Sequence, residues 1–280
     1  MNFELTHARH DRIHCLAPGL FRSLKKGQRN KDKLNITYSH GRYEVQFVCF
    51  EPLAADDLRF LQGLVAMAGP SRIELPPFPS DDALIHLRGL LNAKGEGASM
   101  DGIIIQGKIG RLLTEIGMSD GGENIRSFKI SLKRLANVGI ILTRDAQSAS
   151  FNLLSYSFHL DTGEFKVALN PRLAQAVVGG KSYTKIEMSE VRHLRGDVAR
   201  LIHQRICGFT NPGREHRISI DNLSSYAWPI DAQTSSAVRQ RKARVRKAIE
   251  EIKGCGWDIT EYARDKFLFR RPQKPLLEGK

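Results

Sequence analysis

The sequence predicts an α+β protein in which one order of helices and strands occurs twice. Two observations support this expectation. In both halves of the chain, segments with apolar residues at helical spacing are followed by alternating segments typical of paired strands. In addition, the 280 residues are 41% hydrophobic and 26% charged, which is typical of a folded chain long enough for one large domain or two ordinary ones.

The N-terminal segment, residues 1–50, is expected to form an arm together with the first strands. Ser23–Lys33 is basic and polar, and the alternation from Leu34 to Phe50 favours strands. Leucines at steps of three and four then predict a helix that begins at Ala54 and stops at Gly69-Pro70.

Residues 51–180 are expected to form a first domain, which either holds a partner or contacts DNA. A short strand, Ile103–Gln106, opens its diagnostic region. Two helices and two strands follow in the order Lys108–Ile116, Glu123–Val138, Gly139–Arg144 and Ser150–Leu160. Helix, turn, helix and hairpin in this order predict a winged helix.

Residues 181–280 are expected to form a second domain with the same order, beyond a boundary near Gly179–Lys185. Its predicted elements are the helix Ser189–Ile206, the strand Ile218–Ile220, the helices Asp221–Tyr226 and Ser235–Lys253, and the hairpin Gly256–Tyr262 with Lys266–Arg271. The expected architecture is two tandem winged-helix (helix-turn-helix) domains with an N-terminal arm.

Positive charge dominates the chain and gathers in one helix. The 43 Lys+Arg exceed the 30 Asp+Glu, giving a net charge of +13 and a pI near 9.8, which favours polyanionic partners such as nucleic acid. Six of the ten residues in Val238–Lys247 are basic. Helical spacing turns Val238, Val245, Ile249 and Ile252 toward the core, and therefore turns the basic residues outward.

The outward face of Ser235–Lys253 is expected to bind DNA as the main reading element. Side chains suited to base edges are Arg239, Gln240, Ala243 and Arg246, and those suited to phosphates are Arg241, Arg244 and Lys247, with Lys242 on the same basic surface. Thr234, Ser235 or Ser236 is expected to cap the helix, and Ser235 and Ser236 in its first turn are expected to bind DNA, since free amide groups there favour a phosphate. Arg270 and Arg271, at the end of the hairpin that follows, are expected to contact DNA as well. Replacing Arg239 or Arg246 by Ala is expected to cost about 1–3 kcal/mol at specific sites.

A solvated charged face is the alternative interpretation of this helix. It is disfavoured because no acid at helical spacing occurs before Glu250. In the first domain the helix Glu123–Val138 carries a weaker basic face, for which a DNA contact and an ordinary surface remain equally open. Its basic residues are Arg126, Lys129, Lys133 and Arg134.

Catalytic and metal chemistry is not expected. Gly180-Lys181-Ser182 ends like a phosphate-binding loop, but Gln175 stands where that loop needs a glycine. The residues His7, His10, His14 and Cys15 lack a matched second pair of zinc ligands, and His203 is expected to be a packed or surface side chain. We therefore expect neither a catalytic group, nor a metal, nor a cofactor, and we expect that the chain is not an enzyme.

A cytoplasmic location is expected. The first residues contain no apolar signal core, and the apolar runs are too short to span a bilayer, so no membrane partner is expected. The four cysteines, Cys15, Cys49, Cys207 and Cys255, are scattered and suit reduced thiols.

Four sequence blocks carry a resemblance to a known family. They are HCLAPGLFR (His14–Arg22), ADDLRFLQGLVAMAGP (Ala55–Pro70), VALNPRLAQAVVGG (Val167–Gly180) and ARLIHQRICGF (Ala199–Phe209). In order and spacing the chain resembles the iteron-binding replication initiators of IncQ-type plasmids, called replication protein C. Ser71–Gly97 and the tail after Pro272 resemble them less.

The resemblance implies a protein that binds directly repeated iterons in the vegetative origin of a plasmid. It further implies opening of the adjacent AT-rich DNA and loading of the plasmid helicase and primase, with Ser235–Lys253 as the second recognition helix. Because melting DNA costs about 1.4 kcal/mol per base step, we expect several copies to self-associate on DNA. A winged-helix transcriptional regulator at a promoter operator is the alternative, and an RNA-binding protein is a weaker one.

Overall fold

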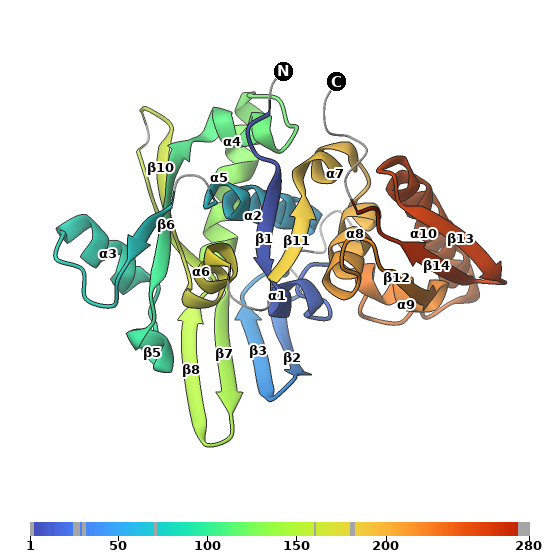
Figure 1. Ribbon diagram of the computed structural model, residues 1–280, viewed down its shortest axis with the longest axis horizontal. Coiled ribbons are helices and arrows are strands. Elements are labelled where there is room, and N and C mark those ends of the chain that lie inside the picture. Colours follow the sequence, from blue (N-terminus) through green and yellow to red (C-terminus); the bar gives the residue numbers. More distant parts are fainter. Residues whose placement is uncertain are drawn as a thin grey trace.

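A computed structural model gives the structure of residues 3–24, 29, 32–69, 72–159, 161–179 and 183–273. Helices and antiparallel strands are mixed along the whole chain, as expected, with the C-terminal part to one side in Figure 1. The sequence expectations for Gly180-Lys181-Ser182 and for most of Ser23–Lys33 lie outside the described residues.

The N-terminal part is built on two antiparallel sheets (Figure 1). The first has the order β2 (Leu34–His40), β3 (Tyr43–Cys49), β7 (Gly139–Arg144), β8 (Gln147–Asn152) and β5 (Lys94–Gly95). The second has the order β4 (Ile73–Leu75), β6 (Gly102–Lys108), β10 (Glu164–Leu169) and β9 (Leu154–Phe158). The helices of this part are α2 (Ala55–Met67), α3 (Asp82–Leu90), the 3₁₀ turn Glu96–Ser99, α4 (Ile109–Glu115), α5 (Gly122–Ala136) and α6 (Pro171–Val178).

The strands around the first helix pair differ from the expected wing. The predicted strand Ser150–Leu160 is divided at Leu153 into β8 and β9, which belong to different sheets. Leu153 is fully buried and its N–H donates to Val138 O at 2.8 Å, so the chain is anchored where it crosses between the sheets. The strand before α4, β6, pairs with β4 and β10 and not with the β7–β8 hairpin.

The C-terminal part has the helices on one side of a three-stranded sheet of order β12-β14-β13. Its elements are α7 (Met188–His193), α8 (Asp197–Phe209), β12 (Glu215–Ser219), α9 (Ile220–Ala227), α10 (Ser235–Gly254), β13 (Asp258–Ala263) and β14 (Lys266–Arg270). The predicted single helix Ser189–Ile206 is two helices. Between them, Glu251 Oε2 on α10 accepts hydrogen bonds from the N–H groups of Arg195 at 3.1 Å and Gly196 at 2.9 Å, and these bonds fix the turn that separates α7 from α8.

The expected N-terminal arm is wrong for the described residues 3–24. The strand β1 (His7–Asp11) pairs antiparallel with β11 (Tyr183–Glu187), and α1 (Arg12–Leu16) packs against α8. Leu5, Ala8 and Ile13 are buried. These residues lie at the centre because their apolar side chains fill the junction between the two parts of the chain.

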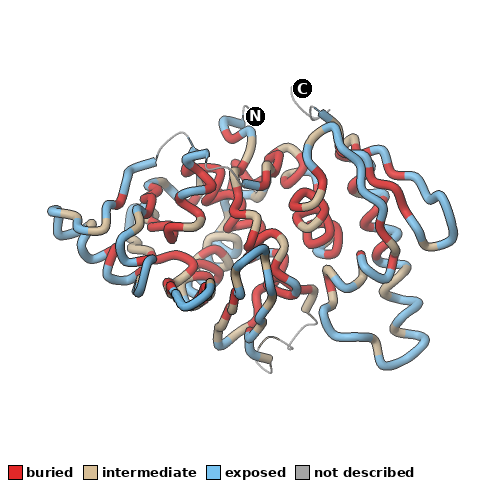
Figure 2. Tube along the Cα trace, turned by 60° about the horizontal axis from the view of Figure 1, so that its bottom comes forward, coloured by how far each residue is buried: buried red, intermediate tan, exposed pale blue. Residues whose placement is uncertain are grey.

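One continuous hydrophobic core runs through both parts, so the expected boundary near Gly179–Lys185 does not separate two cores. Helix α2 packs against α7 and α8, and Gln62 Nε2 on α2 donates to Gln204 Oε1 on α8 at 2.9 Å. Figure 2 shows the buried trace continuing from the centre into the C-terminal part. Among the residues that the structure describes, no helix combines the length and apolarity needed to cross a bilayer.

Candidate nucleic-acid interface

Helix α10 packs its C-terminal half on the core and projects its N-terminal half into solvent. Val245, Ile249 and Ile252 are buried against α8 and α9, whereas the residues of α10 before Val245 are exposed or half-buried. Val238 was expected to face the core and is instead 38% exposed. A protruding helix end of this kind has the shape needed to enter a DNA groove.

The N-terminus of α10 is capped by Thr234. Its Oγ1 accepts the N–H of Ala237 at 3.1 Å, which satisfies one of the free amide groups of the first turn. Ser235 and Ser236, the other expected caps, lie exposed in that first turn. The positive end of the helix dipole therefore faces solvent beside the basic surface.

The solvent face of α10 carries the predicted reading residues. Arg239, Gln240, Ala243 and Lys247 are exposed, as the helical spacing predicts. Within the described part of the chain, the side chains of Arg239, Gln240 and Lys247 make no hydrogen bond or ion pair. These groups are consequently available to an external partner.

Lys242 and Arg246 of the same helix are paired with acids from other elements, although no acid at helical spacing on α10 itself was found to pair them. Lys242 Nζ lies 3.0 Å from both Asp221 Oδ1 and Asp265 Oδ2. Arg246 lies 2.9 Å from Glu261 Oε2 and 2.7 Å from Asp265 Oδ1. Helical spacing missed these acids because they lie on α9 and the β13–β14 hairpin rather than on α10.

The pairing shifts the pKa values on both sides in the direction that favours the charged forms. Hydrogen bonds to Asp265 and then Asp221 raise the pKa of Lys242, and a hydrogen bond to Glu261 raises the pKa of Arg246. The hydrogen bond from Lys242 in turn lowers the pKa of Asp265. Lys242 and Arg246 therefore stay charged, but their charge is already compensated within the protein.

Two further arginines pack on one tryptophan. The guanidinium groups of Arg241 and Arg244 lie 5.4 Å and 4.9 Å from the centre of the Trp228 ring, within cation–π range. Arg241 also donates to Ile230 O at 2.6 Å, and Arg244 to Ser23 Oγ at 3.5 Å. Both arginines remain at the surface in fixed positions, a geometry suited to phosphate contacts.

The tip of the β13–β14 hairpin adds residues that the sequence interpretation missed. Arg264 occupies the turn and Lys266 follows it, and both are exposed. A basic residue in a two-residue polar turn between two strands was the available signal. This hairpin is called the C-terminal wing below.

Arg270 and Arg271, predicted together as DNA contacts, have different environments. Arg270 is exposed and lies 2.9 Å from Glu215 and 3.0 Å from Asp258. Arg271 is only 4% exposed and donates to the carbonyl oxygens of Thr210 at 3.0 Å and Lys185 at 2.5 Å. Arg271 therefore cannot reach DNA, because it satisfies carbonyl groups inside the protein.

The basic face of α5 is also smaller than predicted. Arg126 and Lys133 are exposed, while Lys129 lies 4.6 Å from the centre of the Phe158 ring. Arg134 is held 2.9 Å from the buried Asp57, a carboxylate that also accepts a hydrogen bond from Ser131. Arg134 is thus an internal partner of Asp57 and not a surface contact.

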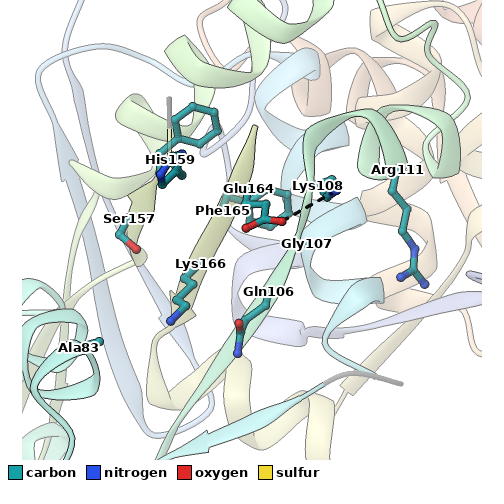
Figure 3. A pocket seen from close by; sticks show the side chains of 11 residues that line it. Ala83, Gln106, Gly107, Lys108, Arg111, Ser157, His159, Glu164, Phe165 and Lys166 are labelled. Atoms are coloured by element: carbon teal, nitrogen blue, oxygen red, sulfur yellow. Dashed lines mark ion pairs between the residues drawn. The ribbon is translucent and has the colours of Figure 1, made fainter. Parts of the chain in front are cut away.

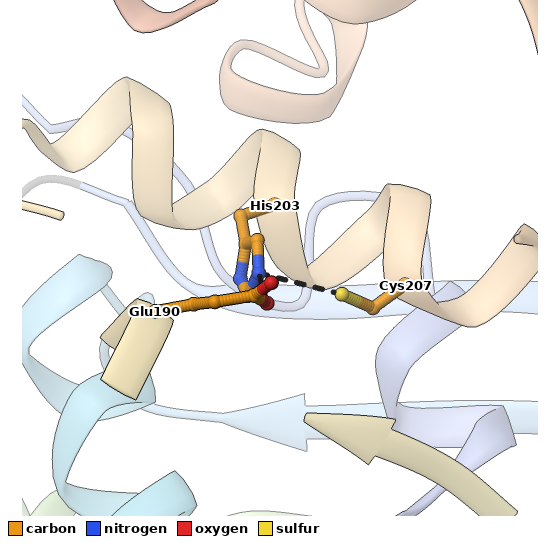
Figure 4. Close-up of side chains that lie close together, drawn as sticks. All are labelled: Glu190, His203 and Cys207. Carbon is orange, nitrogen blue, oxygen red and sulfur yellow. Dashed lines mark hydrogen bonds and ion pairs between the residues drawn. The ribbon is translucent and has the colours of Figure 1, made fainter. Parts of the chain in front are cut away.

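A buried cluster in the C-terminal part has the residue types of a metal site (Figure 4). His203 Nε2 lies 2.6 Å from Glu190 Oε2 and 3.5 Å from Cys207 Sγ, and Trp257 Nε1 donates to Glu190 Oε1 at 3.1 Å. The 2.6 Å contact is a hydrogen bond between two of the three candidate ligands, because two ligand atoms on one ion would lie farther apart. Glu190, His203 and Cys207 are the three residues that would have to bind a metal ion here.

The electrostatics of this cluster favour an internal ion pair. Burial alone would lower the pKa of His203, but the Cys207 sulfur and the Glu190 carboxylate outweigh it and raise that pKa. Burial opposes ionisation of Glu190, and the neighbouring His203 reverses this and lowers its pKa. The pair links α7 to α8 and, through Trp257, to the start of the C-terminal wing.

A second basic surface lies on the N-terminal sheet, at a cavity of about 730 Å³ (Figure 3). Its lining includes the cations Lys108, Arg111 and Lys166 and the acid Glu164, and Lys108 lies 3.9 Å from Glu164. The cations that line this cavity form a basic surface on the N-terminal part that does not involve α5.

Comparison with solved structures identifies the fold. The chain is similar to a crystal structure of RctB domains 2–3, with 11% identity, a TM-score of 0.55, and coverage of 93% of this chain and 96% of that one. A structure of selenomethionine derivatives of RctB domains 2 and 3 matches with 10% identity, a TM-score of 0.55, and coverage of 93% and 97%. At this identity the likeness concerns the fold. No curated protein sequence gives a significant match.

The family follows from the sequence. The family model for replication protein C (RepC) matches residues 2–273, which is nearly the whole chain. The chain belongs to the replication protein C family and is a plasmid replication initiator.

Proposed function

We propose that this chain initiates plasmid replication by binding directly repeated iterons in the vegetative origin, with α10 as the main reading helix. The observation that carries the proposal is the solvent face of α10. Among the residues that the structure describes, this face offers three side chains without an internal hydrogen bond or ion pair: Arg239 and Gln240 in the exposed N-terminal half, and Lys247 on the exposed side of the C-terminal half. Arginine and glutamine match purine edges in the major groove, and lysine matches the phosphate backbone.

The proposal includes tandem winged helices. In the C-terminal part the elements run α8, β12, α9, α10 and a hairpin, with sheet order β12-β14-β13, and this arrangement supports a winged helix in which α10 is the recognition helix. In the N-terminal part α4, α5 and the β7–β8 hairpin follow the same order. Because α5 offers only Arg126 and Lys133 as fully exposed cations of its predicted set, we assign it a secondary DNA contact.

Binding is proposed to promote opening of the adjacent AT-rich DNA, followed by loading of the plasmid helicase and primase. We propose an IncQ-type initiator that acts without a catalytic group or cofactor of its own. The melting energy then comes from several copies that self-associate on the repeats and from supercoiling. Cooperative occupation of neighbouring repeats is therefore part of the proposal.

Footprinting on a supercoiled plasmid that carries the origin, combined with permanganate probing of unpaired thymines, tests this function. We expect protected segments at the regular spacing of the direct repeats and reactive thymines in the adjoining AT-rich tract only when the protein is bound. A single protected site with two-fold symmetry over a promoter, without reactive thymines, would instead identify a transcriptional regulator.

A further inference from the structure

We propose that Asp265 is a positioning residue for DNA recognition, which fixes the C-terminal wing against α10 and thereby sets the preference for specific DNA. The inference rests on the proposed function. Asp265 lies on a basic surface that is proposed to bind DNA, where a negative charge would by itself repel the phosphates.

Asp265 is the hub of a chain of charges that joins three elements. Its Oδ2 accepts a hydrogen bond from Lys242 Nζ at 3.0 Å, and its Oδ1 accepts one from Arg246 Nη2 at 2.7 Å. Lys242 continues the chain to Asp221 on α9, and Arg246 continues it to Glu261 on β13. A change in the angle between wing and helix would break contacts at both oxygens of one carboxylate.

The backbone at Asp265 adds to the fixed geometry. Its φ of 59° lies in the left-handed region, which aspartate tolerates better than most residues. Its N–H donates to Glu261 Oε1 at 2.8 Å, next to the register shift between Glu261 and Ala263. The turn is therefore held by its backbone and its side chain together, which fixes the backbone of the exposed Arg264 that precedes Asp265.

The same contacts give the exposed residues of α10 different roles. Because Arg246 is bound by two carboxylates, it supports the wing, although the sequence predicted it to read bases. Arg239 and Gln240 have no such partners and remain to read bases. Exposed ion pairs contribute little to folding stability, so the network has its main effect on geometry.

A positioning role and a purely electrostatic role of Asp265 predict opposite changes in the affinity of the variant Asp265→Asn for the specific repeats. Removing a negative charge near bound DNA tightens binding to every sequence, because phosphate repulsion falls. Releasing the wing weakens binding only where the helix and the wing must fit together, which is on the specific repeats. The ratio of the two affinities is therefore the informative quantity.

The experiment compares the whole chain with Asp265→Asn and with the control Asp231→Asn, which removes the same charge from the loop before α10. The dissociation constants for a direct-repeat duplex and for a scrambled duplex are measured at one salt concentration. We expect Asp231→Asn to leave the ratio unchanged and Asp265→Asn to lower it about tenfold, with binding to scrambled duplex equal to that of the control. Asp265→Gly, which accepts the same φ without the carboxylate, should behave like Asp265→Asn.

Equal ratios for Asp265→Asn and Asp231→Asn would overturn the positioning role while leaving the proposed function intact. Lack of preference for the repeats in the unmodified chain would overturn the proposed function itself. Thermal unfolding of each variant within a few degrees of the unmodified chain confirms that the comparison is made on folded protein.

Discussion

Arginines that look alike in the sequence have three kinds of environment in this molecule. Arg239 is exposed and has no partner among the described residues, Arg246 is held by two carboxylates, and Arg271 is buried against backbone carbonyl groups. The difference arises from the partner that the fold supplies, because the guanidinium group is always charged and must find acceptors when it is buried. Only the first kind is free to read DNA.

Arg271 should matter for stability and not for DNA affinity. Replacing it by Ala removes the donor of the buried Thr210 carbonyl and of the part-buried Lys185 carbonyl, and a buried group left unsatisfied costs about 1–3 kcal/mol. We therefore expect Arg271→Ala to lower the unfolding free energy by about 2–4 kcal/mol in urea titrations. The neighbouring exposed Arg270 gives the control, since Arg270→Ala should change stability little. Equal effects of the two substitutions would contradict the assignment.

His10 should make the protein sensitive to acid. It is fully buried, and burial lowers its pKa to about 4 from 6.5, with the neighbouring His14 acting in the same direction. The unfolded chain therefore takes up a proton between pH 6.5 and 4 that the folded chain refuses, so stability falls as pH falls through this window.

The variant His10→Leu isolates this effect. Between pH 7 and pH 5 the unmodified chain should lose about 2 kcal/mol more unfolding free energy than His10→Leu, measured by chemical denaturation at both values. An identical loss in both proteins would mean that His10 is protonated without cost in the folded state.

At the scale of elements, α10 is the structure on which DNA binding is proposed to depend. Ala243 lies in the middle of its exposed face, where a small side chain lets the helix backbone approach a groove closely. Leu is nearly as good a helix former as Ala, so Ala243→Leu should keep the helix and obstruct only the approach. We expect affinity for the repeats to fall by about tenfold or more, with unchanged circular dichroism. Unaltered affinity would place Ala243 outside the interface.

The helices α5 and α10 and the β13–β14 hairpin were predictable because each follows from periodicity within a short segment. The β7–β8 hairpin was predicted only in part, since the expected strand Ser150–Leu160 is divided between two sheets. The pairing of β1 with β11 was not, since its partners are far apart in sequence and neither strand has a signal of its own. For the same reason periodicity identified the outward residues of α10 but not the internal roles of Arg134 and Arg271. Whether a charged side chain is buried depends on partners such as Asp57 and Thr210, which only the tertiary fold brings close.

At the scale of the whole molecule, the two parts of the chain share one core and two tight connections. The N-terminal β1 pairs with β11 beside the C-terminal part, and Gln62 is bonded to Gln204 between α2 and α8. A force on the C-terminal part is therefore transmitted to the N-terminal sheets through packed elements rather than through a linker.

This shared core predicts one cooperative unfolding transition. Trp228 and Trp257, the only two tryptophans of the sequence, both lie in the C-terminal part, whereas far-UV circular dichroism reports on the whole chain. We expect the two signals to change at the same denaturant concentration. Separate midpoints would indicate that the parts unfold as independent domains.

The most direct test of the account is the affinity of the chain for a direct-repeat origin duplex and for a scrambled duplex, measured from about 50 to 200 mM salt. We predict tight binding to the repeats, weak binding to the scrambled sequence, and a log–log salt slope that corresponds to about 6–10 phosphate contacts. Equal, weak and salt-sensitive binding to both duplexes would contradict it, because α10 would then supply only positive charge and no sequence recognition.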